Sequence, residues 1–265
     1  MSEGIVFLVG AGPGDPALIT RRAFDLLMEA DAVVYDYLVS GEIVDTLPST
    51  VERHYVGKRG GDHTMSQEEI GRLLVALAGA GQRVVRLKGG DPFLFGRGGE
   101  EALALRAAGL PFEVVPGVTA GIAVPAYAGI PVTHRGVASS VTLVTGHEDP
   151  TKAQRQVDLG VIGQGSDTIA IFMGVGKMEE NCHALIQGGR SPDTPAALIQ
   201  WGTLPQQRTL VATLATLPRR AQEEGIQAPA MMVVGEAVSL RHQLAWHEQK
   251  PLFGRRIVVT HPREG

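Results

Sequence analysis

The sequence predicts an α/β protein built from two α/β domains. Short apolar runs alternate with helical patterns through the first half of the chain, and glycine-rich loops directly follow several of these runs. Buried strands that alternate with helices are typical of a parallel sheet. The second half contains two neighbouring strand patterns, 196–201 and 208–213, without a helix between them. This pair indicates a mixed sheet, because neighbouring strands joined by a short turn run antiparallel.

The elements of the first half follow from hydrophobic periodicity and from turn residues. One helix start is marked by a capping box, in which the Ser66 hydroxyl and the Glu69 carboxylate stand three residues apart. The predicted strands are 5–9, 32–35, 51–56, 82–87 and 112–115, and the predicted helices cover 17–28, 66–79 and 101–108.

Pro116-Gly117 is the predicted hinge to the second half. We therefore expect an N-terminal domain over 1–115, a C-terminal domain over 118–248, and a linker over 249–265 that includes a fresh strand from Arg255. The stretch 152–167 fits neither pattern clearly. The strands predicted in the second half are 141–145, 168–173, 196–201, 208–213 and 230–234, and the helices are 118–128, 177–186 and 217–224.

Composition excludes several classes of function. A net charge of −4 over 265 residues gives no general attraction to nucleic acid or to anionic membranes. No apolar run reaches the roughly 18 residues that a membrane-spanning helix needs. The single cysteine, Cys182, excludes an internal disulfide and is interpreted as a packing residue. Because the first residues also lack a basic signal-peptide region, we expect a cytoplasmic protein.

The most informative segment is the glycine-rich loop over 87–101, which follows a predicted buried strand. Loops at the carboxyl ends of parallel strands are where ligands usually bind, and glycines let a ligand approach the main chain. The charged residues of this loop are expected to make selective polar contacts. They are Lys88, Asp91, Arg97, Glu100 and Glu101.

Two further predicted strands end at charged residues. Asp36 follows the strand 32–35, and Lys58 follows the strand 51–56. From neighbouring strand ends they could face one cleft and move a proton, or both could be solvated charges. Basic residues could also form a rim that binds carboxylates. They are Lys58, Arg59, Arg97, His134 and Arg135.

Other motifs argue against common alternatives. The first glycine turn lacks the third glycine of a dinucleotide fingerprint, because Asp15 stands there, and Pro13 removes a backbone N–H. The eight histidines show no spacing typical of a metal site, so no metal is expected.

These motifs, in this order, resemble those of the tetrapyrrole methylases, the class III S-adenosylmethionine-dependent methyltransferases. The resemblance covers nearly all of 4–247 and favours the members that act on uroporphyrinogen III. The matching text is VGAGPGD (9–15), VVYDYLVS (33–40), VGKRGG (56–61), RLKGGDPFLFGRGGEE (86–101), FEVVPGVTAG (112–121), YAGIPVTHRG (127–136), VTGHE (144–148), FMG (172–174), WGT (201–203) and PAMMVVGEAV (229–238).

The resemblance implies a two-domain fold with the active-site cleft between the domains, and a homodimer. It implies that Asp36 accepts a proton, that Lys58 donates one, and that S-adenosylmethionine is the methyl donor. The positions that correspond to donor-binding residues are Pro13, Gly89, Gly90, Asp91, Leu94, Thr119, Ala120, Met173 and Gly202. Those that correspond to the side facing the substrate carboxylates are Arg97, Thr133, His134 and Arg135.

The implied reaction methylates carbons 2 and 7 of uroporphyrinogen III, giving precorrin-2, a precursor of siroheme and cobalamin, and two S-adenosylhomocysteines. The alternative is a methyltransferase that acts on a later corrin intermediate. The stretch 150–167 departs from the family pattern, and the tail KPLFGRRIVVTHPRE (250–264) resembles the linker and first strand of a uroporphyrinogen-III synthase domain.

Overall fold

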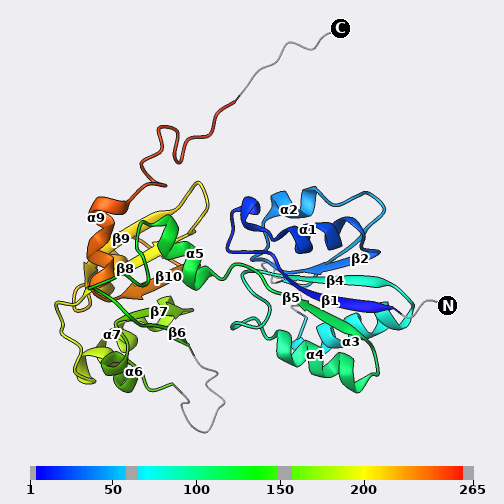
Figure 1. Cartoon of the computed structure of the whole chain (residues 1–265), viewed down its shortest axis with the longest axis horizontal. Coiled ribbons are helices and arrows are strands. Elements are labelled where there is room, and N and C mark those ends of the chain that lie inside the picture. Colours follow the sequence, from blue (N-terminus) through cyan, green and yellow to red (C-terminus); the bar gives the residue numbers. More distant parts are fainter. Residues whose placement is uncertain (1–3, 58–64, 148–156, 259–265) are drawn as a thin grey trace. The chain divides into compact units, whose positions relative to one another are not determined.

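The computed structural model describes residues 4–57, 65–147 and 157–258. The chain divides into two units, one up to Ala123 and one from Val124 onward. The division falls inside helix α5 (Ala120–Tyr127), a little after the hinge predicted at Pro116-Gly117. Each unit contains one five-stranded sheet, drawn with its helices in Figure 1.

The first unit is a parallel sheet of strands in the order β3-β2-β4-β1-β5. Each strand pairs in parallel with its neighbours, so all five strands end at the same edge of the sheet. The strands are β1 (Ile5–Gly10), β2 (Ala32–Tyr35), β3 (Glu52–Tyr55), β4 (Arg83–Lys88) and β5 (Phe112–Val115). The helices are α1 (Arg21–Met28), α2 (Gly41–Asp45), α3 (Gln67–Gly79) and α4 (Gly98–Ala107).

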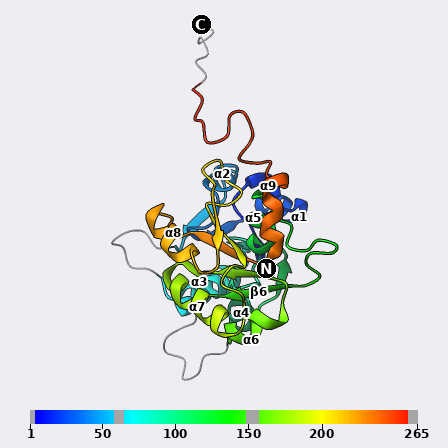
Figure 2. The same cartoon turned by 90° about the vertical axis from the view of Figure 1, so that its left-hand side faces the viewer.

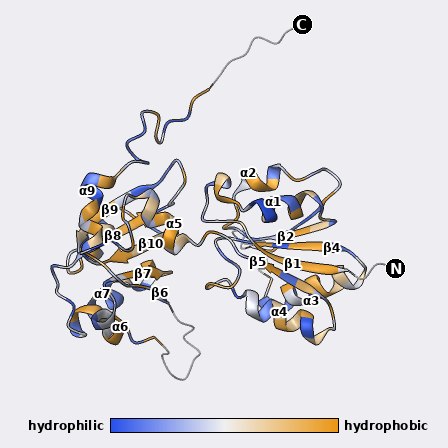
Figure 3. Cartoon of the chain, in the orientation of Figure 1, coloured by the Kyte–Doolittle hydropathy of each residue, from blue (hydrophilic) through white to orange (hydrophobic). Residues whose placement is uncertain are grey.

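Helices cover both faces of this sheet (Figure 1). One core joins α1 and α2 to the sheet face that carries Phe7, Val33 and Leu87. The other joins α3 and α4 to the face that carries Leu8 and Val34. Because both faces are covered, the central strands are apolar along most of their length, as the hydropathy colouring in Figure 3 shows.

Side-chain caps fix where α1 and α3 begin. The predicted capping box is confirmed: the Ser66 hydroxyl accepts from Glu69 N at 3.2 Å, and Glu69 Oε2 accepts from Ser66 N at 2.6 Å. Thr20 caps α1 in the same way through Ala23 N. The predicted helix 17–28 is therefore shorter than expected, because a 3₁₀ turn (Pro16–Leu18) precedes this cap.

The second unit is the mixed sheet that the sequence predicts. Its order is β6-β7-β10-β8-β9, with β6 and β7 parallel and the remaining pairs antiparallel. The strands are β6 (Val141–Thr145), β7 (Thr168–Phe172), β8 (Pro195–Gln200), β9 (Arg208–Thr213) and β10 (Ala230–Val234). The helices after α5 are α6 (Leu159–Gly165), α7 (Met178–Gln187), α8 (Leu217–Glu223) and α9 (Arg241–Leu244).

One apolar core in this unit joins α6, α7 and α8 to the sheet, and the buried Cys182 belongs to it. Figures 1 and 2 both show α6 and α7 side by side. Burial raises the pKa of the Cys182 thiol to about 12, which agrees with the packing role expected for it.

The structure corrects several predicted elements. The stretch 152–167 contains helix α6, whose start is capped by Asp158 through Val161 N. The short helices α2 and α9 were not predicted, because each is too short to show a periodicity. The residues Arg255–Val258 form no strand, and the rest of the strand predicted there lies outside the described residues.

Candidate active site

The carboxyl edge of the parallel sheet brings together most of the predicted site residues of the first unit. Pro13 follows β1, Asp36 follows β2, and the glycine-rich loop follows β4. The segment after β5 leads to Thr119 and then to Ala120, the first residue of α5. Because all five strands are parallel, these loops share one edge, as the sequence predicts.

At the centre of this edge the main chains approach too closely for side chains. Gly12 and Gly90 form a bridge in which each backbone N–H donates to the other's carbonyl, at 3.2 Å and 2.6 Å. A Cβ on Gly117 would lie 2.2 Å from the carbonyl oxygen of Gly90, and a Cβ on Gly10 would lie 2.5 Å from the same atom. The loops after β1, β4 and β5 therefore meet through bare backbone, the kind of surface that a ligand can approach closely.

Asp91 ties two of these loops together. Its Oδ1 accepts from Phe93 N at 2.8 Å and from Leu94 N at 3.1 Å, and its Oδ2 accepts from Gly117 N at 3.1 Å. The carboxylate thus shapes the start of the glycine-rich loop and holds it against the segment after β5. A change at Asp91 would disturb the close contact between these loops even if the side chain itself never touched a ligand.

The Asp36 carboxylate is partly exposed and held from two sides. Its Oδ1 accepts from Leu38 N at 3.2 Å, and its Oδ2 pairs with the guanidinium of Arg86 at 3.3 Å. The side chain keeps 28% of its surface accessible, whereas that of Arg86 keeps only 3%. Asp36 can therefore contact a ligand at the sheet edge while Arg86 holds its Oδ2 from the interior.

Beneath Asp36 lies a buried ion cluster, which we define as Arg86, Lys88 and Glu101; the neutral, partly buried Gln67 adjoins it. Glu101 Oε1 accepts from Arg86 Nε at 3.1 Å, from Lys88 Nζ at 2.8 Å and from Gln67 Nε2 at 2.9 Å. Within the part of the chain that the structure describes, Glu101 Oε2 is buried and has no hydrogen-bond partner. Removal from water is costly for such charges, so they persist only because each is paired.

Burial lowers the pKa of Lys88, and the nearby Arg86 cation lowers it further. The Glu101 carboxylate, 2.8 Å away, acts in the opposite direction. The desolvation of the ammonium is the larger effect. Lys88 and Glu101 therefore face one another in the interior rather than an open loop, and the ligand contacts expected of this loop stay a prediction.

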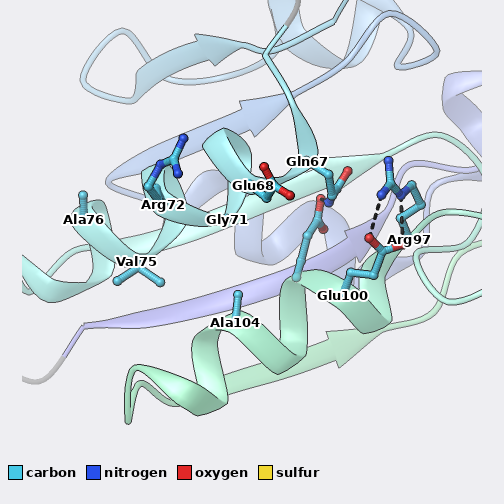
Figure 4. Close-up of a pocket in the computed structure, with 10 residues that line it drawn as sticks. Gln67, Glu68, Gly71, Arg72, Val75, Ala76, Arg97, Glu100 and Ala104 are labelled. Carbon is cyan, nitrogen blue, oxygen red and sulfur yellow. Dashed lines mark hydrogen bonds and ion pairs between the residues drawn. The ribbon is translucent and has the colours of Figure 1, made fainter.

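Arg97 stands at the start of α4 in a left-handed conformation, with φ 58°. It forms a bidentate ion pair with Glu100, in which Nε donates to Oε1 at 2.9 Å and a terminal nitrogen donates to Oε2 at 2.7 Å. This contact lowers the pKa of Glu100. Figure 4 shows this pair at one end of a groove between α3 and α4. The predicted substrate-facing arginine is thus held by its neighbour, and its guanidinium remains about half exposed.

The second unit contributes two predicted positions that follow strands. Met173 comes directly after β7 and Gly202 shortly after β8. Both strands run antiparallel to β10, so they end at the same edge of their sheet. A Cβ on Gly202 would lie 2.4 Å from the Val124 side chain, so only glycine fits there.

Strained backbone surrounds these positions. Met173, Trp201 and Thr203 all have positive φ, at 54°, 49° and 70°. Non-glycine residues adopt this conformation rarely and at a cost, and such positions cluster at functional sites. Asn181 braces the same edge, donating to the carbonyls of Gly146 and Gly174 at 3.2 Å and 3.4 Å.

Thr133, His134 and Arg135 lie in an exposed turn between α5 and β6. The turn is closed by a bridge between His134 and Ala138, and the His134 ring contacts the Arg135 carbonyl at 2.9 Å. Two other predicted residues, Lys58 and Arg59, lie outside the described residues. The basic rim predicted from five residues therefore stays a prediction.

Sequence reasoning missed the cluster around Arg86 and the strained positions. The signal for the cluster was present, because Arg86 and Lys88 stand two residues apart in a strand otherwise buried on both faces. No helix in the described ranges is long and apolar enough to cross a membrane. The same ranges contain no group of three or more histidines, cysteines or acidic residues placed to hold a metal ion.

Comparison with known proteins places this geometry in context. A model of the family Tetrapyrrole (Corrin/Porphyrin) Methylases matches residues 6–218. The chain is 52% identical over 237 residues to an S-adenosyl-L-methionine-dependent uroporphyrinogen III methyltransferase from Methanosarcina barkeri, covering 89% of this chain and 93% of that protein. It is 54% identical over 246 residues to a siroheme synthase from Azotobacter vinelandii, covering 92% of this chain but only 52% of that protein.

Solved structures give the same result. Uroporphyrin III C-methyl transferase from Thermus thermophilus is 41% identical with a TM-score of 0.76, covering 89% of this chain and all of that one, and it is also known in complex with S-adenyl homocysteine. A cobalt precorrin-4 methyltransferase is 30% identical with a TM-score of 0.79, covering 88% of this chain and 95% of that one. The predicted fold class of two α/β domains is confirmed by these likenesses.

Proposed function

The chain belongs to the tetrapyrrole methylase family, and from this premise we propose that it is a uroporphyrinogen-III C-methyltransferase. It transfers methyl groups from S-adenosylmethionine to carbons 2 and 7 of uroporphyrinogen III, giving precorrin-2 and two S-adenosylhomocysteines. The observation that carries the proposal is the 52% identity, over 93% of its length, to the methanogen's uroporphyrinogen III methyltransferase. The chain spans about half the length of the siroheme synthases that it matches, so their whole activity is not assigned to it.

The residues present fit a methyl donor. In the backbone cradle, which we define as Gly12, Gly90 and Gly117, the loops after β1, β4 and β5 present bare main chain at the sheet edge, and a Cβ on Gly117 would push them apart. When bound, S-adenosylmethionine supplies a methyl group that its sulfonium makes electrophilic. The residues proposed to hold it are Pro13, Gly89, Gly90, Asp91, Leu94, Thr119 and Ala120 in the first unit, with Met173 and Gly202 in the second.

The substrate would combine a broad apolar ring with eight carboxylates. Two adjacent loops of the first unit, one of which begins at Asp36, expose large apolar side chains at Tyr37, Leu38, Phe93 and Phe95. The loops are in contact, because a Cβ on Gly89 would lie 2.8 Å from that of Leu38. We assign the carboxylates to Arg97 and to Thr133, His134 and Arg135, since guanidinium groups bind carboxylates in a directional manner.

The protein's own chemical task is alignment and proton removal. An electron-rich pyrrole carbon needs no strong base to attack a methyl group, but a proton must then leave the macrocycle. We assign its acceptance to the Asp36 carboxylate, which is held at the sheet edge by Leu38 N and Arg86. Lys58 is proposed as the proton donor. Positioning of the reacting carbon supplies most of the remaining rate enhancement.

The alternative reaction, methylation of a later corrin, is weaker on sequence. The fold does not separate the two, because the cobalt precorrin-4 methyltransferase has a TM-score of 0.79 and the uroporphyrin enzyme 0.76. Identity does separate them, at 30% against 41%. The two reactions differ in substrate, so a direct assay discriminates between them.

The test mixes the protein with S-adenosylmethionine and freshly made uroporphyrinogen III under reducing, anaerobic conditions. We expect a product heavier by two CH2 units, because each methyl group replaces a hydrogen, detected by mass spectrometry, and two S-adenosylhomocysteines per product. Absence of methylation on this substrate, together with methylation of a later precorrin, would favour the alternative. Asp36→Asn is expected to lower kcat by about 100-fold or more while donor affinity changes little.

The donor cradle has its own test. Gly117→Ala places a methyl group against the Gly90 carbonyl, so we expect at least tenfold weaker S-adenosylmethionine binding by calorimetry. Gly99→Ala in helix α4 is the matched control, since a Cβ there meets nothing within 4 Å. Equal donor affinity in the two variants would contradict the placement of the cradle.

We also propose that the protein is a cytoplasmic homodimer. The dimer rests on the family resemblance, and sedimentation equilibrium measures it directly. A monomer across the micromolar range would contradict it.

A further inference from the structure

We propose that Arg86 is a positioning residue for Asp36: its guanidinium, locked in place by Glu101, fixes the carboxylate in the orientation that accepts the substrate's proton. The inference rests on the proposed function and adds to it a residue outside the sets assigned above to catalysis, donor and substrate. Arg86 does not reach the sheet edge itself, because only 2% of its surface is accessible. It acts through Asp36.

The contacts of Arg86 explain why it can hold another group still. Its Nε donates to Glu101 at 3.1 Å, and one terminal nitrogen donates to the carbonyls of Val34 and Leu87 at 3.3 Å and 3.2 Å. The other terminal nitrogen reaches Asp36 Oδ2 at 3.3 Å. One rigid, planar group is thus bonded to strand β2, strand β4 and helix α4 at once, so its position is set by the fold.

Strand register brings the two side chains together. Val34 on β2 is level with Arg86 on β4, so Asp36 falls level with Lys88. Side chains alternate along a strand, and residues 34, 36, 86 and 88 therefore share the sheet face that packs against α3 and α4. On that face, the charged groups form the last layer above an apolar core, directly below the carboxyl edge.

A purely structural role explains less. If Arg86 served only to neutralise Glu101, Lys88 would suffice, because its ammonium lies 2.8 Å from the same oxygen. A second buried cation would then add desolvation cost without need. The additional bond of Arg86, to the partly exposed Asp36, connects the cluster to the proposed site of chemistry.

The test is a double-mutant cycle between Arg86→Gln and Asp36→Asn, measured on the full-length protein with S-adenosylmethionine and uroporphyrinogen III. We expect Arg86→Gln alone to lower kcat by about 10- to 100-fold, with KM and donor affinity each changed less than about threefold. In the Asp36→Asn background the same change should lower kcat less than about twofold, because there is no longer a carboxylate to orient.

Lys88→Gln is the matched control. It also removes a cation from Glu101, and Lys88 interacts with Asp36 only through a weak charge–charge attraction, without a hydrogen bond or ion pair in the described structure. We expect its coupling to Asp36→Asn to be much weaker than that of Arg86→Gln. If Arg86→Gln does not fold, Arg86→Lys keeps the charge but cannot make all four bonds, so the same loss of kcat is expected from a folded protein.

The possible outcomes are distinct. Equal factors for Arg86→Gln in the two backgrounds, or full kcat in Arg86→Lys, would overturn the positioning role while leaving the proposed function intact. Coupling of Lys88→Gln to Asp36→Asn as strong as that of Arg86 would overturn the specific assignment to Arg86. A wild-type protein that does not methylate uroporphyrinogen III would overturn the proposed function, and this inference with it.

Discussion

The two units build their site edges in different ways. In the first unit, the buried layer under the edge is charged, and it contains Arg86, Lys88 and Glu101. In the second, the buried polar side chains among the described residues are hydroxyls, amides and one histidine, and the loops after β7 and β8 carry strained backbone at Met173, Trp201 and Thr203. Positive φ occurs at both edges, since Phe95 and Arg97 of the first unit share it, but among the described residues the layer of buried charges lies only under the first edge.

The difference matches the roles proposed for the two edges: the first accepts the proton and holds most of the donor, and the second adds only donor contacts. Proton transfer depends on the orientation and charge of a carboxylate, which only nearby charged groups can control strongly. Binding of a methyl donor depends on shape and on exposed backbone groups, which unusual φ angles and glycines provide. We therefore expect substitutions in the buried ion cluster of the first unit to act through charge, and substitutions at the positive-φ residues of the second unit to act through conformation.

The largest expected effect on stability comes from a comparison of a buried charged residue in the first unit with a buried neutral residue in the second. Glu101→Ala leaves two cations buried without their carboxylate, and we expect the free energy of unfolding to fall by about 3–5 kcal/mol. Asn181→Ala removes a buried neutral amide that braces two loops, and we expect a loss of about 1–2 kcal/mol. Urea denaturation measures both values. Equal losses would show that charge does not distinguish the two edges.

A second prediction uses the lowered pKa of Lys88. Between that lowered pKa and the ordinary value of 10.5, the unfolded chain binds more protons than the folded one. The contribution of Lys88 to the free energy of unfolding therefore rises as the pH increases through this window, by up to about 1.4 kcal/mol per pH unit. Lys88→Met lacks this term, so the difference between wild type and variant should rise with pH.

The measurement is urea denaturation of both proteins at intervals from neutral pH to about pH 10. Carboxylates and exposed lysines titrate alike in the two proteins, so they cancel in the difference. A difference that falls with pH would mean that Glu101 stabilises the Lys88 cation more than burial opposes it.

The architecture could be predicted from the sequence because it depends on periodicity. Strands buried on both faces read as continuous apolar runs, and the capping box at Ser66 fixes the start of α3 through local hydrogen bonds alone. The placement of Asp36 at a strand end followed from the same pattern. These features depend on residues close together in the chain.

The interior of the site could not be predicted, because it depends on long-range contacts. Arg86 meets Asp36 only through the pairing of β2 with β4, and Glu101 meets Lys88 only because α4 packs on that face. The positive φ of Met173 has no local sequence signal, since methionine does not favour that conformation. Tertiary structure imposes it.

The smallest expected effect tests the strained edge. Alanine is normally more stable than glycine by about 0.4–1 kcal/mol, because glycine has more freedom in the unfolded chain. At Met173, with φ 54°, the order should reverse: Met173→Gly should be more stable than Met173→Ala by about 1 kcal/mol, since only glycine adopts that angle without strain. Met173 is 54% exposed, so both variants lose similar packing.

Val161 provides the control, because it is 67% exposed in helix α6 of the same unit and has ordinary helical backbone. There, Val161→Gly should be less stable than Val161→Ala by about 1 kcal/mol. Thermal denaturation of the four variants compares the two positions directly. If glycine is the less stable residue at Met173 as well, the conformation of that loop costs nothing, and the second edge is not held by strained backbone.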